Sequence, residues 1–325
     1  MARQILPALR RGASWLPTVV LLLASLATAG SPLGIWSSHI ERLSHFRLWW
    51  LGVLLLLAFW FIRRRQPVPG ILAVLVVGWS LMPVLPYWFA PRPAASPSAA
   101  QAPLKVIAWN VLWSNPQKAE ALAWLEAQDA DLILLTECTV EWREELAPLT
   151  TTWPHQISSN RDGAEGMWLL SRYPLAPADA DGLAAKKPWI STLVQTPAGP
   201  VRVLGMHPRT PRSGTRFDDR NEQYEHAASI ASQATSSGIP ALLMGDLNCT
   251  PFSPWFSRLL ERGALRDSAL GFGLSGTWHG QGVRLPIDHI LVNDRFSVLA
   301  RRVEEDRRGS DHHPVKATLV LQARP

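Results

Sequence analysis

The stretch Pro240–Asn248, PALLMGDLN, carries the clearest indication of the fold. Its apolar run has the length of a buried β-strand, and it ends on a carboxylate, Asp246, and an amide, Asn248. The apolar part suits the interior of a sheet, whereas the polar side chains at its end can serve a site at the edge of that sheet. The same design recurs along the chain.

Five further apolar runs end on, contain or follow polar residues of the same kind. Asn110 follows KVIAW, Glu137 follows LILLT, His207 follows RVLGM, Asp288 lies inside LPIDHILV, and Asp311-His312-His313 precedes PVKATLVL. Taken singly, each has an ordinary explanation as a turn residue, a solvated strand end or a helix N-cap. Because strands of one sheet frequently end side by side, the six strand ends together can converge on one pocket.

Such convergence would gather oxygen ligands at one place: Asn110, Glu137, Asp246, Asn248 and Asp311. Carboxylate and amide oxygens suit a hard divalent cation, so the expected cofactor is Mg²⁺ or Mn²⁺. The chain has no HExxH motif and no Cys/His spacing typical of zinc. It also lacks a GxSxG elbow and a Cys–His arrangement, so no covalent nucleophile is indicated.

Residues 104–325 alternate predicted strands and helices and are long enough to bury a full core as one domain. Strands are expected at 104–110, 131–137, 166–174, 189–196, 201–206, 240–248, 287–292, 296–303 and 315–321. Helices are expected at 116–127, 140–146, 219–236 and 253–262. Strands outnumber helices and both types are mixed along the chain, which favours two sheets with helices outside them.

Seven short motifs follow one another through this domain: Trp109-Asn110, Leu135-Thr136-Glu137, Ser171-Arg172-Tyr173-Pro174, His207-Pro208, Gly245-Asp246-Leu247-Asn248, Ile287-Asp288-His289-Ile290 and Ser310-Asp311-His312-His313-Pro314. Together they resemble the endonuclease/exonuclease/phosphatase superfamily, which includes deoxyribonuclease I and neutral sphingomyelinases. The resemblance runs from about residue 104 to 321. It implies an α+β fold of the deoxyribonuclease I-like type, a four-layer β-sandwich of two sheets flanked by helices, with the site at one edge.

The resemblance also implies a role for each polar strand end. Glu137 and Asn110 would hold the divalent metal, with Asp311 nearby. Asp246 and Asn248 would position and activate the attacking water. The implied activity is metal-dependent hydrolysis of a phosphoric ester.

The remaining implied catalytic residues are His312, Asp288 and His207. His312 would support the developing charge or shuttle a proton, oriented by Asp288, and His207 would contact phosphate oxygens. Attack on a phosphate diester must neutralise negative charge and stabilise the leaving alkoxide, which explains why cationic and hydrogen-bonding groups are needed.

The loop after His207 is rich in arginine and could contact a second phosphate or a lipid headgroup at the mouth of the pocket. The candidate substrate-binding residues in it are Arg209, Arg212 and Arg216, with Arg220 at its end. A solvated basic loop is the alternative. Trp278 is a further candidate, either stacking on a substrate group or packing against its neighbours.

Residues 1–90 contain three apolar segments, at about 14–33, 46–63 and 70–90, and are expected to form a transmembrane helical module. The middle segment is short and would depend on flanking side chains that reach the interface. In an alternative interpretation residues 1–29 are a cleaved signal peptide, which leaves two spans. The Pro/Ala/Ser-rich residues 91–103 are expected to form a linker between this module and the catalytic domain.

The orientation in the membrane is predicted from arginines in short loops. Arg3, Arg10 and Arg11 precede the first apolar segment, and Arg63–Arg65 separate the second from the third. Three spans with a cytoplasmic N-terminus place both clusters in the cytoplasm, and the alternative with a signal peptide gives the same side. The layout is similar to that of membrane-anchored bacterial members of the superfamily, so the predicted location is the bacterial inner membrane, with the catalytic domain on the periplasmic or extracellular side.

The chain has a formal net charge of +6, but the basic excess is confined to one part. Residues 1–100 hold nine arginines, no lysine and one acidic residue, whereas residues 101–325 hold 23 basic and 25 acidic residues. A strongly basic face for nucleic acid is therefore not expected on the domain. The leading substrate classes are a lipid headgroup or a nucleotide, with the membrane as the only other partner and no protein partner indicated. The alternatives are a nuclease acting on DNA or RNA and a catalytically inactive, membrane-bound interaction module.

The two cysteines directly follow predicted site residues, Cys138 after Glu137 and Cys249 after Asn248. Adjacent side chains of a strand point to opposite faces, so both thiols are expected to face away from the metal. Two cysteines exclude a disulfide-stapled scaffold. A single disulfide between them and two buried free thiols both stay open.

Overall fold

The computed structural model describes residues 15–92, 102–159, 161–178, 189–280 and 282–322. These residues divide into two compact units. The helical unit comprises the chain up to Pro86 with Phe252–Trp255, and the sheet unit comprises Tyr87–Pro251 and Phe256–Pro325. The predictions that concern Arg3, Arg10 and Arg11, and residues 93–101 of the predicted linker, lie outside the described residues.

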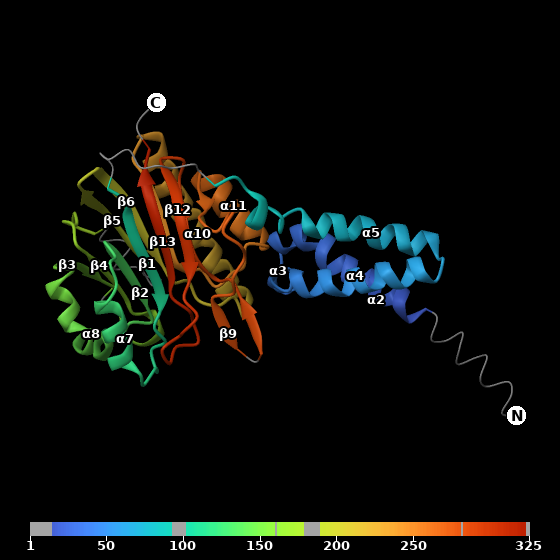
Figure 1. Cartoon of the computed structure of the whole chain (residues 1–325), viewed down its shortest axis with the longest axis horizontal. Helices are drawn as coiled ribbons and strands as arrows, with labels where there is room; N and C mark the ends of the chain where they lie inside the picture. The colour runs from blue at the N-terminus through green and yellow to red at the C-terminus, as the bar shows by residue number, and fades with distance from the viewer. Residues whose placement is uncertain (1–14, 93–101, 160, 179–188, 281, 323–325) are drawn as a thin grey trace, which may run out of the picture. The chain divides into compact units, whose positions relative to one another are not determined.

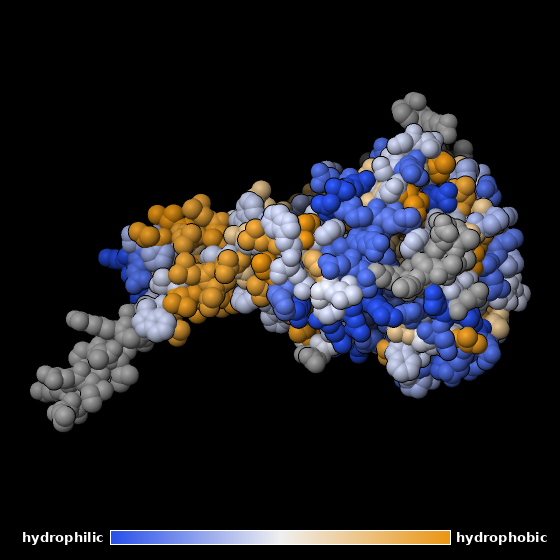
Figure 2. Space-filling view, turned by 180° about the vertical axis from the view of Figure 1, so that it is seen from behind, coloured by the Kyte–Doolittle hydropathy of each residue, from blue (hydrophilic) through white to orange (hydrophobic). Residues whose placement is uncertain are grey.

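The helical unit consists of strongly apolar helices and of shorter helices that connect them. They are α2 (Leu16–Ala29), η1 (Ser31–Ile35), α3 (Ser38–His45), α4 (Arg47–Arg63) and α5 (Pro67–Leu81). Leu21, Leu54 and Phe61 pack with Ala73 in a small shared core. Much of the remaining apolar surface is uncovered, for example Leu56, which is 73% exposed, and it forms the broad apolar area of this unit in Figure 2.

The helices of this unit are shorter than the predicted apolar segments. Among the described residues, no one helix combines the length and apolar character needed to cross a membrane, whereas α3 and α4, bent by 67° at their junction, meet those two requirements as a pair. The third predicted segment, 70–90, is divided because α5 ends at Leu81 and the short helix α6 (Pro86–Phe89) follows. Pro83 and Pro86 lack the N–H that a continuous helix requires. The number of spans stays a prediction.

The sheet unit contains the predicted sandwich of two sheets (Figure 1). The first sheet has the order β12 (Phe296–Val303), β13 (Val315–Leu321), β1 (Leu104–Asn110), β2 (Leu132–Thr136), β4 (Met167–Ser171) and β3 (His155–Ser158). The second has the order β5 (Trp189–Thr196), β6 (Gly199–Met206), β7 (Ala241–Asp246), β11 (Asp288–Val292) and β8 (Arg266–Asp267). A separate ribbon pairs β9 (Trp278–Gly280) with β10 (Val283–Leu285).

Strand β1 shows why the sequence of a central strand is apolar throughout. Val106 and Ala108 belong to the core between the two sheets. Ile107 and Trp109 belong to a second core on the outer face of the first sheet. That second core includes residues of α7 (Lys118–Glu126), α8 (Val140–Glu145) and η2 (Ala147–Thr151). Because both faces are covered, alternation between apolar and polar residues disappears.

The second sheet is covered by α10 (Gly214–Ser236), which packs on β6 and β7 and completes the four layers. This helix begins five residues before the predicted start because Ser213 acts as its N-cap, accepting a hydrogen bond from the Arg216 N–H. The helix predicted from Ser253 is α11 (Pro254–Gly263). The prediction missed β3, β8, β9 and β10, which have only two to four residues each and show no clear periodicity.

Candidate active site

The predicted polar strand ends meet at one edge of the sandwich. In the first sheet, β1 and β2 run parallel with Asn110 opposite Thr136, so Glu137 directly follows the strand end beside Asn110. In the second sheet, β7 and β11 are antiparallel, and Asp246 at the end of β7 pairs with Asp288 at the start of β11. Pairing within each sheet therefore brings two polar residues to the same edge.

Asn110 connects the two sheets at this edge. Its Nδ2 donates to Oε1 of Glu137 at 2.9 Å and to Oδ2 of Asp246 at 3.1 Å, and lies 3.4 Å from Nε2 of His312. Its Oδ1 accepts a hydrogen bond from the Leu112 N–H. The amide nitrogen rather than the oxygen faces the carboxylates, so a metal-ligand role for Asn110 would require the amide to turn and stays a prediction.

His207 lies between the two carboxylates. Its Nε2 is 3.4 Å from Oδ2 of Asp246 and 3.8 Å from Oε1 of Glu137. Burial alone would lower the pKa of the imidazole, but Asp246 and Glu137 outweigh it and the pKa is raised. The two acids thus favour the charged form of the ring.

His312 is held by two carboxylates on opposite sides of its ring. Nδ1 is 2.8 Å from Oδ2 of Asp288, and Nε2 is 3.6 Å from Oδ2 of Asp246. Burial disfavours the imidazolium, yet Asp288 and Asp246 together raise the pKa of His312 to about 10. Asp288 therefore fixes the ring so that Nε2 faces the cluster.

Asp246 and Asn248 form a tight turn at the end of β7. Oδ1 of Asp246 accepts a hydrogen bond from the Asn248 N–H at 2.9 Å. The Asn248 side chain donates to the Pro208 carbonyl and accepts from the Thr210 hydroxyl, both at 2.9 Å. Burial would raise the pKa of Asp246, but His312 and His207 lower it, so the carboxylate is charged.

Asp311 is anchored by Trp278 of the β9–β10 ribbon. The indole Nε1 donates to Oδ2 of Asp311 at 2.8 Å, and Oδ1 of Asp311 lies 3.9 Å from Nε2 of His312. Neither stacking nor packing, the two roles expected for Trp278, included this hydrogen bond. The polar edge of the indole is engaged with a site residue, so Trp278 acts on the site through Asp311.

The predicted arginine cluster is not gathered around the site. Arg209 forms an exposed ion pair with Glu165 at the end of η3 (Gly163–Glu165). Arg212 and Arg216 are exposed and have no acidic partner in the described part of the chain. Arg220 is fully buried in α10, where its guanidinium bonds to Asn221, so the prediction that it borders a ligand-binding loop was wrong. Arg220 lies inside both the predicted helix, 219–236, and the longer helix that the structure shows.

Three non-glycine residues at the strand ends adopt the left-handed backbone region. The φ angles are 60° for Leu112, 56° for Glu137 and 51° for Asn248. Such conformations cost about 1–3 kcal/mol each and cluster at functional sites. They also end the strand alternation on which the prediction for the cysteines relied. Both Cys138 and Cys249 are nonetheless buried, and both thiols are free.

Sequence reasoning missed the residues that support the site from behind. Ser310 donates to the Asn110 carbonyl at 2.7 Å and accepts from the His312 N–H at 3.0 Å. The Thr277 hydroxyl accepts from the Asp288 N–H at 2.9 Å. Ser310 stood in a motif already noted for its neighbours, so its position could have indicated it. Thr277 had no comparable signal.

The donor chemistry of the site fits a hard divalent cation. Glu137, Asp246 and Asp311 offer carboxylate oxygens, and Oδ1 of Asp311 is buried without a hydrogen-bond partner among the described residues. Ligand atoms of Asp246, Asp288 and His312 also lie within 4.8 Å of one another. This trio is the only group with that spacing among the described residues, so the metal-ligand roles of Glu137 and Asp311 stay predictions.

A sandwich of two sheets with an acid, amide and imidazole cluster at one edge is the class of fold that the sequence motifs indicated. Residues 107–312 match the Endonuclease/Exonuclease/phosphatase family, and the protein belongs to that family. Comparison with curated proteins gives no significant match.

Several solved structures share the fold. An endonuclease/exonuclease/phosphatase family protein from Bacteroides thetaiotaomicron is 19% identical, with a TM-score of 0.55, and the match covers 69% of this chain and 99% of that one. TDP2 from Caenorhabditis elegans is 16% identical, with a TM-score of 0.56, over 68% of this chain and 75% of that one. A family member from Beutenbergia cavernae is 21% identical, with a TM-score of 0.50, over 67% and 72%. At these identities the likeness establishes the fold.

Proposed function

We propose that this protein is a membrane-attached, divalent-metal-dependent phosphoric ester hydrolase in which water attacks the phosphate. The observation that carries the proposal is the contact of one amide, Asn110, with Glu137 and Asp246, with the imidazoles of His207 and His312 on either side. Carboxylates and imidazoles meet there within 4 Å of one another. That combination suits an anionic ester whose phosphorus must be approached by water.

The chain's own residues supply distinct parts of this chemistry. Asp246 is charged and oriented by the Asn248 N–H, so it can hold a water molecule and accept its proton. His207 and His312 can donate hydrogen bonds to nonbridging phosphate oxygens, and His312 can protonate the leaving alkoxide through Nε2. A divalent cation held by Glu137 and Asp311 would neutralise charge on the phosphate as a Lewis acid.

The proposal of membrane attachment rests on the helical unit. Its apolar side chains are exposed to an extent that water disfavours, with Leu56 and Phe59 at 73% and 65% exposure. Arg63–Arg65 lie in a short turn between two apolar helices, and such arginines favour the cytoplasmic side. We therefore place the catalytic domain on the non-cytoplasmic side. The slight acidic excess of residues 101–325 favours a lipid headgroup or small phosphate ester over nucleic acid.

The test is hydrolysis by the purified full-length protein of a chromogenic phosphodiester, sphingomyelin, phosphoinositides and duplex DNA, with and without a chelator. Asp246→Ala is expected to abolish activity, and Asp294→Ala, an exposed carboxylate away from the site, is the matched control. Silence on every substrate would favour the inactive interaction module. Turnover that resists the chelator would contradict the metal-dependent mechanism, and cleavage of DNA alone would favour the nuclease.

A further inference from the structure

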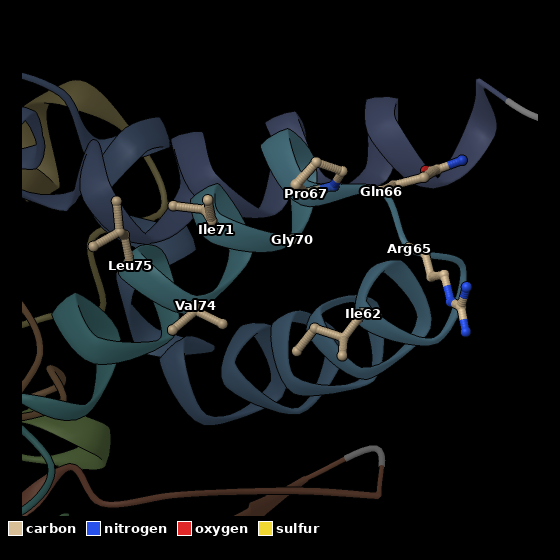
Figure 3. Close-up of a pocket in the computed structure, with 8 residues that line it drawn as sticks. All are labelled: Ile62, Arg65, Gln66, Pro67, Gly70, Ile71, Val74 and Leu75. Atoms are coloured by element: carbon tan, nitrogen blue, oxygen red, sulfur yellow. The ribbon is translucent and has the colours of Figure 1, made fainter.

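The helical unit contains a groove of about 520 Å³ between α4 and α5 (Figure 3). Its walls and mouth are formed by Ile62, Gly70, Ile71, Val74, Leu75 and Arg65. Figure 3 shows Ile62 and Val74 on facing sides of the two helices and Arg65 on the turn that joins them. The volume is within the range of natural ligand pockets.

Gly70 lies where α5 comes close to α4. A Cβ at this position would lie 3.7 Å from Cβ of Phe61 and 3.9 Å from Cγ1 of Ile62, which is ordinary van der Waals contact. Ile71 and Leu75 remain 62% and 66% exposed along one side. Within the described chain nothing covers these apolar walls, so a hydrocarbon chain can pack against them.

The groove ends at a concentration of positive charge. Arg63, Arg64 and Arg65 follow one another at the end of α4, and the left-handed φ of 55° at Arg65 turns the chain toward α5. Arg64 lies over the Trp60 ring at 5.6 Å. None of the three arginines forms an ion pair within the described residues. The only acidic residue among residues 1–100 is Glu41, which is fully buried.

We infer that this groove binds an anionic phospholipid, with an acyl chain between α4 and α5 and the phosphate on Arg65 and its two neighbours. An uncharged hydrocarbon would leave the arginines unpaired, and a free phosphate would make no contact with the apolar walls. Basic pockets between membrane helices recognise anionic headgroups in this way. The inference rests on the membrane attachment proposed above and is independent of the catalytic chemistry.

The test uses the full-length protein in detergent micelles and counts bound lipids by native mass spectrometry after addition of phosphatidylglycerol or phosphatidylcholine. The wild type should retain phosphatidylglycerol preferentially. Val74→Trp fills the groove and should weaken that retention about fivefold or more. Arg65→Gln removes one charge and should weaken it to a similar extent, because one arginine near an anionic lipid is worth about 1 kcal/mol. The controls are Val68→Trp, 78% exposed on α5 and outside the groove, and Arg302→Gln in the sheet unit, with its side chain 69% exposed.

Each outcome decides the question. Equal retention by wild type, Val74→Trp and Arg65→Gln would overturn the inference, and so would equal retention of the two lipids by the wild type. Loss in Val68→Trp as well as Val74→Trp would indicate general disturbance of α5, in which case Arg65→Gln decides. Cell fractionation tests membrane attachment separately, and wild-type protein outside the membrane fraction would refute the proposed attachment. Variants that stay in the membrane fraction but retain less phosphatidylglycerol would support lipid binding in the groove.

Discussion

The indole nitrogen of Trp278 donates a 2.8 Å hydrogen bond to Oδ2 of Asp311. The next residue of the ribbon, His279, donates its backbone N–H to the Asp311 carbonyl at 2.8 Å. Asp311 is therefore held through both its side chain and its backbone by a strand that belongs to neither sheet. The short β9–β10 ribbon therefore fixes the carboxylate of Asp311 beside His312.

Trp278→Phe should lower kcat/KM about tenfold and raise the Mn²⁺ concentration for half-maximal binding, because a hydrogen bond to a charged group contributes about 1.5–3 kcal/mol. Isothermal calorimetry with Mn²⁺ measures the second effect without turnover. Trp153→Phe is the control, since it removes an indole hydrogen bond of equal length to the Ala130 carbonyl within the core. It should reduce thermal stability and leave Mn²⁺ binding unchanged. Equal Mn²⁺ affinity in Trp278→Phe and wild type would contradict the anchoring role.

Asp288→Asn should reduce kcat about 100-fold or more, because the imidazole of His312 loses the partner that orients it and favours its charge. His312→Ala should have a similar effect. Because the two residues act as one unit, the double variant should be no slower than the slower single variant. Steady-state kinetics on the most active substrate provides the double-mutant cycle. Multiplicative losses in the double variant would show that Asp288 acts independently of His312.

Addition of Mn²⁺ should raise the melting temperature of the wild type, since a ligand that binds only the folded state stabilises it. Glu137→Gln should abolish most of this increase because it removes one of the charged oxygens of the site. Asp294→Asn, an exposed carboxylate elsewhere in the sheet unit, should keep the full increase. Differential scanning calorimetry with Mn²⁺ and with a chelator distinguishes these cases. An unchanged response in Glu137→Gln would remove Glu137 from the metal-binding residues.

The lowered pKa of the Asp267 carboxyl predicts how the stability of the fold depends on pH. Burial would raise the pKa of this carboxyl, but His289 and Arg301 lower it, with help from the Ala269 N–H at 2.9 Å. A carboxyl with a lower pKa in the folded state stabilises the fold above its unfolded pKa of about 3.9, and this contribution disappears as pH falls through the folded pKa. Asp267→Asn should thus cost about 1–3 kcal/mol at pH 7. Urea unfolding at pH 7 and pH 3 should show the difference between wild type and variant shrinking in acid. A constant difference would contradict this linkage.

The sequence was sufficient to predict which polar residues meet at one edge, because these residues stand where long apolar runs stop. A central strand buried on both faces, such as β1, appears as an uninterrupted apolar run, and its end is visible at Asn110. Parallel and antiparallel pairing then brings such ends together without further information. The order of the motifs supported the same conclusion.

Other features depend on tertiary contacts that no local pattern reveals. Arg220 is a charged residue and was expected at the surface, but the packing of α10 against the second sheet buries it with Asn221. The sequence left both stacking and packing open for Trp278, and only the folded ribbon shows that its nitrogen donates to Asp311. The orientation of the Asn110 amide likewise follows from its neighbours in both sheets.

Asn110 lies in the first sheet, and its partner Asp246 lies in the second. The 3.1 Å contact therefore depends on the alignment of the two sheets, and a small shift of one sheet against the other would break it. A substitution in the core between the layers, far from any reacting atom, would misalign the amide and the carboxylate before it unfolded the sandwich. Substitutions that loosen the core between the sheets should therefore reduce activity before they reduce the fraction of folded protein.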